Sequence, residues 1–350
     1  MAHRRGLFFM LFLVLYYVVY MMTFSVLFAA FGIPAIVSSL WFQMFFQVTV
    51  LLLPLAIWLA LFREKINAHL PHMSLGNTNI LYLVGLSIFI QPALMTVSGL
   101  TNLLFPNEIG EFVLNRMDYP FWMLLLAIAV TPAICEEVVF RGYLQSTYKD
   151  KSFWVMALVN GLFFGIIHFN AHQFFFAFLA GIFFAYIVHA TRSIRAGVIS
   201  HFLMNASQVS LLWFATRLPY WLETLAKILG NIAEQYDPDF ELPIETAYDF
   251  TDPEMFGAVI FMIITIALIV ITSSIFAYLL FRGFDAHNKK RVADYEAKIA
   301  AEAAETPNET PNEDPKSEPA EKRKNLIFDG AIILAIVAVY VFIVFGIPLF

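Results

Sequence analysis

Long apolar runs are the feature that most constrains what this chain can fold into. A helix needs about 20 apolar residues to cross the ~30 Å hydrocarbon core of a bilayer, where its backbone must satisfy its own hydrogen bonds. Hydrophobic residues make up 60% of the chain and charged residues 14%, whereas soluble domains average roughly 45–50% and 25%. We therefore predict an all-α, polytopic transmembrane helical bundle of nine spans. The predicted spans are 7–32, 36–62, 79–104, 120–146, 153–170, 173–191, 196–216, 256–281 and 326–349.

Basic residues recur beside alternate ends of these runs. Arg4 and Arg5 precede the first run, and further clusters of Lys and Arg follow the second, fourth, sixth and eighth runs and precede the ninth. With nine spans, these clusters all fall on one side of the membrane, which the positive-inside rule assigns to the cytoplasm. Acidic residues gather in the opposite loops, above all in 234–254. We expect an integral, multi-pass protein with its N-terminus inside and the lipid bilayer as its surroundings.

Composition divides the chain into segments. The stretch 221–236 has the pattern of an interfacial amphipathic helix. Residues 285–305 have the composition of a polar, Ala-rich helix. Residues 306–324 are too polar and proline-rich to pack a core, so we expect a disordered linker there. The predicted segments are 1–119, N-terminal transmembrane helices; 120–216, a helical core; 217–255, an acidic outer segment; 256–281, a transmembrane helix; 282–325, a charged disordered inner linker; and 326–350, a C-terminal transmembrane helix.

Charged and polar side chains inside predicted spans are functional candidates. Each costs roughly 2.5–3.5 kcal/mol on insertion scales when it is charged and central, so it is rarely present without a role. Glu136, Glu137 and Arg141 fall in the fourth span, His168 in the fifth, and His201 with Asn205 in the seventh. The only cysteine, Cys135, adjoins this group, and we expect it to be a buried, inert thiol.

Helix geometry sorts these candidates. Residues four apart share a face, so Arg141 is expected to neutralise Glu137. Adjacent residues differ by about 100° in direction, which leaves Glu136 to project elsewhere. His201 and Asn205 share a face by the same rule.

Hairpin geometry relates two of the spans. Glu136 and His168 are equidistant from position 152, at the turn between the fourth and fifth spans. We therefore expect these two side chains to meet at one depth in the membrane.

This residue set supports two mechanisms for peptide hydrolysis, which the residue types leave open. In the first, Glu136 and His168 activate a water, while His201 and Asn205 donate hydrogen bonds to the oxyanion. In the second, Glu136, His168 and His201 bind a divalent metal such as zinc, as in a metalloprotease. The HExxH spacing of one common zinc site is absent.

Three short motifs resemble a known family. Residues 136–141 fit EExxxR, 164–168 fit FxxxH and 201–205 fit HxxxN. Their order and spacing resemble those of the CAAX-protease and bacteriocin-processing (CPBP, or Abi) family of intramembrane proteases, over about 120–215. The long acidic segment, and the polar linker followed by a ninth span, depart from the family pattern.

The resemblance implies a membrane endopeptidase of a bacterial plasma membrane, with a membrane-associated peptide as its substrate, either prenylated and of CAAX type or bacteriocin-like. It implies that Glu136 and His168 activate water and that His201 and Asn205 form the oxyanion site. Glu137 and Arg141 would be structural or would assist. The family was first called metal-dependent, and a metal-free glutamate mechanism is favoured for its best-studied members.

Two other functions fit the same polar residues. A membrane immunity or scaffold protein would keep Glu137–Arg141 as a structural ion pair and His201 with Asn205 as a pair that joins helices. A proton-coupled transporter would use a buried Glu–His–Arg cluster as a relay, although the repeats that typify transporters are absent. Nothing in the sequence indicates binding to nucleic acid.

Overall fold

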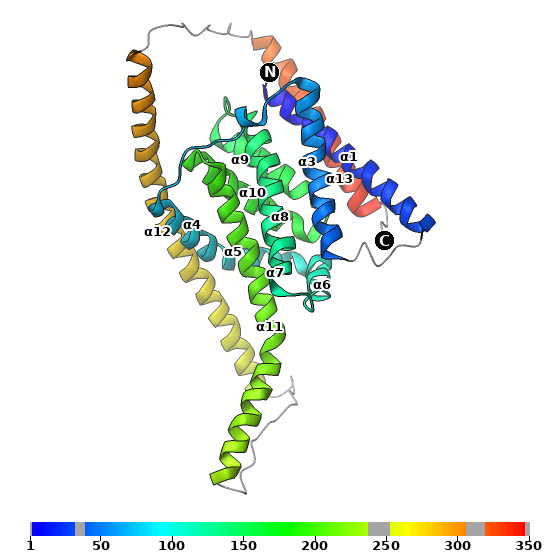
Figure 1. The fold of residues 1–350 in the computed structure, drawn as a ribbon, viewed down its shortest axis with the longest axis vertical. Helices are drawn as coiled ribbons and strands as arrows, with labels where there is room; N and C mark the ends of the chain where they lie inside the picture. Colours follow the sequence, from blue (N-terminus) through cyan, green and yellow to red (C-terminus); the bar gives the residue numbers. More distant parts are fainter. Residues whose placement is uncertain (1, 32–38, 237–252, 306–318, 347–350) are drawn as a thin grey trace.

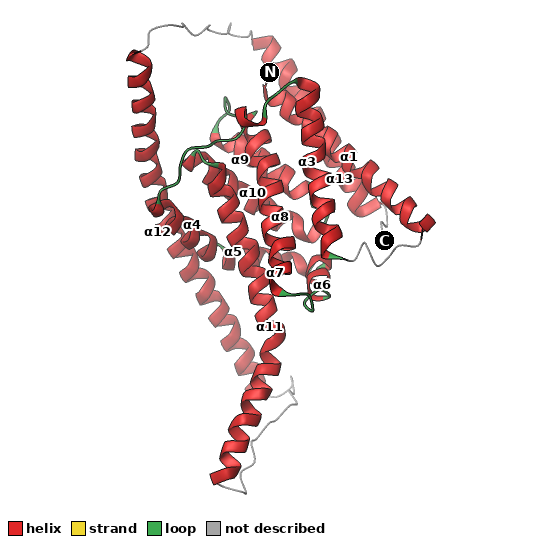
Figure 2. Ribbon diagram, viewed as in Figure 1, coloured by secondary structure: helices red, strands yellow, loops and turns green. Residues whose placement is uncertain are grey.

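A computed structural model describes residues 2–31, 39–236, 253–305 and 319–346. Within these ranges the chain is helical and forms no β-strand, apart from the isolated bridge between His72 and Ser193 (Figure 2). The first helices are α1 (Ala2–Phe31), α3 (Leu40–Phe62), α4 (Asn77–Phe89), α5 (Gln91–Asn102) and α6 (Glu108–Leu114), with a short 3₁₀ turn at Ile66–Ala68. A continuous rod follows, made of α7 (Phe121–Leu124), a π-helical segment (Leu125–Val130), α8 (Thr131–Glu137) and a second π-helical segment (Val138–Leu144). The remaining helices are α9 (Phe153–Ile166), α10 (Ala171–Thr191), α11 (Ile194–Tyr236), α12 (Pro253–Glu305) and α13 (Pro319–Gly346).

The predicted fold class is confirmed. Among the described residues, seven helices or longer helical stretches are long and apolar enough to cross a membrane, and two shorter apolar helices lie at Phe153–Ile166 and Asp329–Phe345. They correspond one by one to the nine predicted runs. The third run is two helices, α4 and α5, which meet at Ile90. Pro92, in the first turn of α5, has no backbone N–H to donate to the carbonyl of Ile88, so the helical hydrogen bonding is interrupted there.

The helices surround the rod that carries the two adjacent glutamates. Helices α9, α10 and α11 pack against the rod on one side and α3 on another, while α13 lies beside α1 at the edge of the bundle (Figure 1). Arg141 and Tyr143, near the end of the rod, are among the largest fully buried side chains in the described structure. The intramembrane charges therefore lie in the interior of the bundle.

The basic clusters gather at one end of the bundle, as predicted. Arg5 at the start of α1 bonds Glu64 after α3, with Nη1 2.7 Å from Oε1. The backbone N–H of Met73 donates to the carbonyl of Arg192, just before α11, at 2.9 Å. Arg291 of α12 donates to the carbonyl of Ser74 at 2.5 Å. Segments far apart in sequence thus share one polar end.

Two expectations about the polar segments need correction. Residues 282–305 continue α12, which agrees with the polar helix predicted over 285–305 and corrects the assignment of 282–305 to a disordered linker. Residues 319–325 begin α13, so they are helical rather than disordered. The run after residue 293 is rich in Ala, Glu and Lys, which are strong helix formers, and Pro319 is suited to the first helical position. Residues 306–318 lie outside the described residues.

The acidic outer segment is also partly helical. Residues 217–236 extend α11 without a break through Pro219, beyond the rest of the bundle (Figure 1). The predicted amphipathic helix is thus a continuation of a span rather than a separate element. Residues 237–252 of this segment lie outside the described residues.

Candidate active site

A free carbonyl group in the rod positions Asn205. Residue 132 is a proline, so the carbonyl of Ile128 has no backbone N–H four residues later. Asn205 of α11 donates from Nδ2 to this carbonyl at 3.1 Å, and Thr131 donates its hydroxyl to Leu126 at 2.8 Å. Asn205 therefore joins α11 to the rod at the place where the rod lacks its own hydrogen bond.

Glu137, Arg141 and His201 form a buried charged trio. Oε1 of Glu137 lies 3.0 Å from Nη1 of Arg141 and 3.1 Å from Nδ1 of His201, and neither side chain of the Glu–Arg pair is exposed. Arg141 also donates to the carbonyl of Gly181 at 3.1 Å. A Cβ at Gly197 would collide with Oε2 of Glu137, so the glycine permits the close approach of α11. The predicted pairing of Glu137 with Arg141 is present.

Glu136 faces a different set of groups. Its Oε2 lies 3.8 Å from Nε2 of His201, too far for a hydrogen bond. Its Oε1 accepts a hydrogen bond from Nε2 of Gln47 on α3 at 3.2 Å. The side chain of Glu136 stays 10% exposed, whereas that of Glu137 is not exposed at all. Of the two carboxylates, Glu136 is the one with an oxygen available to a small molecule.

His168 lies just beyond α9, not within it. The helix ends at Ile166, and Phe169 takes a left-handed conformation with φ of 46°. Asn170 then caps α10 by accepting from the N–H of Gln173 at 2.9 Å. The predicted fifth span to residue 170 is therefore too long, because this cap starts a new helix.

The tautomer of His168 follows from its partner. Nδ1 lies 2.6 Å from the carbonyl oxygen of Phe164, and a carbonyl only accepts, so Nδ1 carries the proton. In the neutral ring Nε2 is then an acceptor. The side chain lies within electrostatic range of Glu136, His201 and Arg141. Its half-buried position leaves Nε2 suited to bind a water.

Aromatic rings hold the imidazoles in place. Phe164 contacts His168 edge-on with ring centroids 5.1 Å apart, which matches the four-residue spacing of the motif. Phe184 stacks on His201 at 4.7 Å. The guanidinium of Arg141 lies 4.2 Å from the ring centroid of Phe164, a favourable cation–π contact.

The structure gathers all six predicted residues around the rod, and it adds Gln47. Gln47 lies in the second span, apart from the charged residues, histidines and motif asparagine that make up the predicted site. The signal was nevertheless present, since Gln43 and Gln47 are polar residues four apart in an apolar run.

The proposed metal ligands do not form a metal site. In the described part of the chain, no group of three or more His, Cys, Asp or Glu side chains is arranged to hold a metal ion. Nδ1 of both histidines is bonded, to Glu137 and to the Phe164 carbonyl, which leaves Nε2 of each ring as the nitrogen that could bind a metal. Because the described side chains do not bring three such ligands together, we derive no step through a metal.

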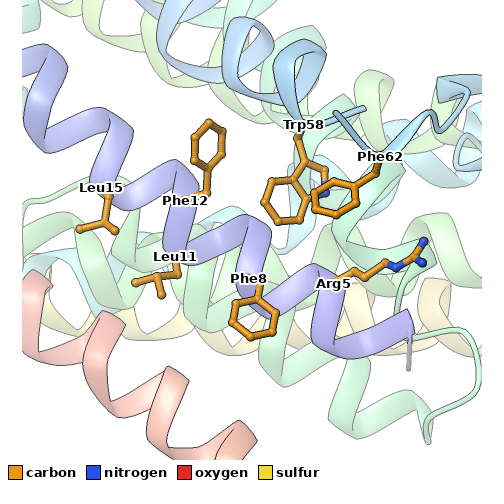
Figure 3. Close-up of a pocket in the computed structure, with 7 residues that line it drawn as sticks. All are labelled: Arg5, Phe8, Leu11, Phe12, Leu15, Trp58 and Phe62. Atoms are coloured by element: carbon orange, nitrogen blue, oxygen red, sulfur yellow. The ribbon is translucent and has the colours of Figure 1, made fainter. Parts of the chain in front are cut away.

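Two apolar grooves lie apart from these polar groups. Figure 3 shows a groove of about 400 Å³ between α1 and α3, lined by Arg5, Phe8, Leu11, Phe12, Leu15, Trp58 and Phe62. It contains none of the six predicted residues. A second groove of about 280 Å³ is lined by Val130, Ala133, Ile134, Val198, Ile199 and Phe202. This second groove is built by the same two elements, the rod and α11, that carry Glu136 and His201.

The contact of Asn205 with the rod yields a prediction. Asn205→Leu removes the donor to the buried carbonyl of Ile128, and we expect a loss of about 1–3 kcal/mol in unfolding free energy. Adding Pro132→Ala restores a backbone N–H and should recover part of it. Thermal unfolding in detergent measures the stability, and Thr216→Leu on the exposed part of α11 is the control. Equal stability of Asn205→Leu and wild type would show that this hydrogen bond does not join the helices.

Comparison with known proteins agrees with the motif reading. Residues 118–207 match a protein-family model described as Type II CAAX prenyl endopeptidase Rce1-like. This segment of the chain is Rce1-like, consistent with the CPBP family. It contains the six predicted residues, whereas Gln47, α12 and α13 lie outside it. No curated protein and no solved structure matches the chain. The match is to a family of proteases, so the region is of a hydrolase type in a membrane setting.

Proposed function

We propose that the chain is an intramembrane endopeptidase of the CPBP type, which hydrolyses a peptide bond of a membrane-associated substrate with a water activated by Glu136 and His168. The observation that carries the proposal is the division between the two carboxylates. Glu137 is paired with Arg141 and His201, whereas Glu136 keeps Oε2 free of hydrogen bonds to the described residues and partly exposed. A general base needs such an available oxygen.

The chemistry follows from this placement. A water held between Oε2 of Glu136 and Nε2 of His168 gives its proton to Glu136 as its oxygen attacks the peptide carbonyl carbon. The carbonyl π electrons move to oxygen and form an oxyanion. When the intermediate collapses, the C–N bond breaks and the proton on Glu136 passes to the leaving amine. One water is consumed, and an acid and an amine are released.

The oxyanion needs donors, and two side chains can supply them. Nδ1 of His201 donates to Glu137, so Nε2 donates only when the ring is protonated. Asn205 donates one amide hydrogen to the carbonyl of Ile128, and its second amide hydrogen remains to donate to the oxyanion. Such fixed donors are worth several kcal/mol to a developing negative charge.

The substrate we favour is a prenylated peptide of CAAX type, with a bacteriocin-like peptide as the alternative. The description of the matched family and the apolar groove between the rod and α11 support the prenylated peptide. The direct test uses the purified protein in proteoliposomes with a farnesylated peptide that ends in a CAAX sequence. Mass spectrometry is expected to detect release of the last three residues. If the protein releases the last three residues from an unmodified peptide but not from the farnesylated one, the lipid requirement is overturned.

A variant of the apolar groove tests the lipid requirement separately. Val198→Trp fills the groove, and we expect it to lower kcat/KM for the farnesylated peptide at least tenfold through KM. The unmodified peptide should be affected less than twofold. Leu211→Trp, at an exposed position of the same helix, is the matched control. Equal losses for both peptides would contradict a role of this groove in binding the lipid.

We further propose a bacterial plasma membrane and a cytoplasmic N-terminus, which the shared basic end of the bundle supports. Helix α11 begins at Ile194 in this end, beside Arg195. His201 follows seven residues later, about 10 Å along the helix. The site would then lie in the cytoplasmic half of the membrane, within reach of a peptide delivered from inside.

A non-catalytic scaffold is the second candidate, and one observation favours it. Glu137, Arg141, His201 and Asn205 all bond to one another or to backbone, as in a purely structural polar network. Glu136 separates the two functions. Oε2 of Glu137 also lacks a hydrogen-bond partner among the described residues, but it is buried, whereas the side chain of Glu136 remains partly exposed, which a scaffold does not need.

A further inference from the structure

Two glutamines of α3 extend the site beyond the matched region. Gln47 donates from Nε2 to Oε1 of Glu136 at 3.2 Å. The other end of its amide, Oε1, is buried and accepts no hydrogen bond from the residues that the structure describes. Oε1 of Gln43, one turn earlier on the same helix, is in the same condition. Both side chains remain partly exposed as a whole.

A buried carbonyl oxygen without a donor destabilises the fold. Gln43 and Gln47 are four apart, so both lie on one face of α3. Their positions differ by about 6 Å along the helix axis. Gln47 contacts Glu136, and Gln43 continues the same face of α3 by one turn, so the two acceptors form a short row that begins at the base.

We propose that this row binds the backbone of an extended peptide, with Gln47 and Gln43 accepting hydrogen bonds from two alternate N–H groups of the substrate. The proposal rests on the proposed function and deepens it, since it names the form in which the substrate is recognised. Alternate N–H groups of an extended chain point to the same side and repeat about every 6.6–6.8 Å. This repeat matches the row on α3.

The membrane setting gives the row a physical reason. A peptide drawn into the bilayer loses water from its N–H groups, and each N–H group left without an acceptor there is strongly unfavourable. Side-chain amides that accept from the backbone recover this cost whatever the substrate's side chains are. Because Gln47 also holds Glu136, the residue that fixes the register of the peptide is the one that orients the base.

Ester scanning tests the proposal. In the farnesylated CAAX-type peptide, each backbone N–H near the scissile bond, other than that of the scissile bond itself, is replaced in turn by an ester oxygen. The wild-type protein is expected to lose about three- to tenfold in kcat/KM at two positions separated by two residues. The position between them should have little effect. This pattern is measured on the wild type, so it does not depend on any variant folding.

Variants then assign the two positions. Gln47→Met should abolish the sensitivity to one ester and Gln43→Met the sensitivity to the other, each at the expense of activity on the all-amide peptide. Phe45→Met, at an exposed position of the same helix, should keep both sensitivities. Equal tolerance of esters at every position, or an unchanged pattern in the two glutamine variants, would overturn the proposal.

Failure of this inference differs from failure of the proposed function. If the wild type cleaves the peptide and Glu136→Gln does not, the enzyme assignment holds whatever the ester pattern. If Glu136→Gln cleaves at the wild-type rate, the proposed function itself fails, and the substrate row loses its basis.

Discussion

Glu136→Gln is expected to reduce cleavage of the farnesylated peptide by at least 10²–10⁴-fold, the usual contribution of a general base. Glutamine keeps the volume of the side chain and can still bond to Gln47, but it cannot take a proton from water. The variant should therefore insert and unfold like the wild type, which thermal unfolding in detergent would check. Glu223→Gln, an exposed carboxylate on the extension of α11, is the matched control and should keep full activity.

The contrary outcome has a definite meaning. Full activity in Glu136→Gln would show that this carboxylate does not act as a base. If the wild type shows no cleavage and Glu136→Gln lowers only the stability, the scaffold function is favoured. The loss of activity at unchanged stability is expected only for an enzyme.

Arg141→Met is expected to have the largest effect on stability. It leaves Glu137 as a buried carboxylate without its guanidinium partner, and breaking a buried pair in this way costs about 3–5 kcal/mol. Arg141 also supplies a hydrogen bond to Gly181 and a cation–π contact with Phe164, both of which are lost. Chemical unfolding in detergent, with yield in the membrane fraction, measures the effect.

The double variant Glu137→Gln/Arg141→Met separates charge from packing. Glutamine is neutral and still accepts from Nδ1 of His201, so the uncompensated charge disappears. Most of the lost stability should return. If the double variant is as unstable as Arg141→Met alone, the cost lies in the packing of Arg141 rather than in the unpaired carboxylate.

Helix periodicity made much of the fold and the site predictable. Apolar runs of bilayer length indicate spans without knowledge of their partners, and residues four apart must share a face. Glu137 therefore meets Arg141, and Phe164 meets His168, as the structure has them. Such relations need only local geometry.

The features that could not be predicted depend on contacts between helices. The rod contains two π-helical segments, and no residue pattern in 120–146 indicates them. Hydrogen bonding of His201 to Glu137 and of Asn205 to Ile128 requires the depth of α11 relative to the rod. The contact of Gln47 with Glu136 joins residues 89 apart in sequence, and spacing carries no information about it.

Polar composition alone also misled at the ends of helices. Residues 319–325 are charged and fall in the predicted disordered linker, yet they begin α13. The polar helix predicted over 285–305 is confirmed as the end of α12, because alanine, glutamate and lysine favour helix outside the membrane as well. Low hydropathy marks where a span ends, but it does not mark where a helix ends.

Cleavage in ¹⁸O-labelled water tests the central claim most directly. The purified protein is incubated with the farnesylated peptide in this solvent, and mass spectrometry follows the new carboxyl terminus. We expect wild type to place one ¹⁸O atom in the new carboxylate and both Glu136→Gln and His168→Ala to form almost no product. Labelled product formed at the wild-type rate by either variant would contradict activation of water by these two side chains.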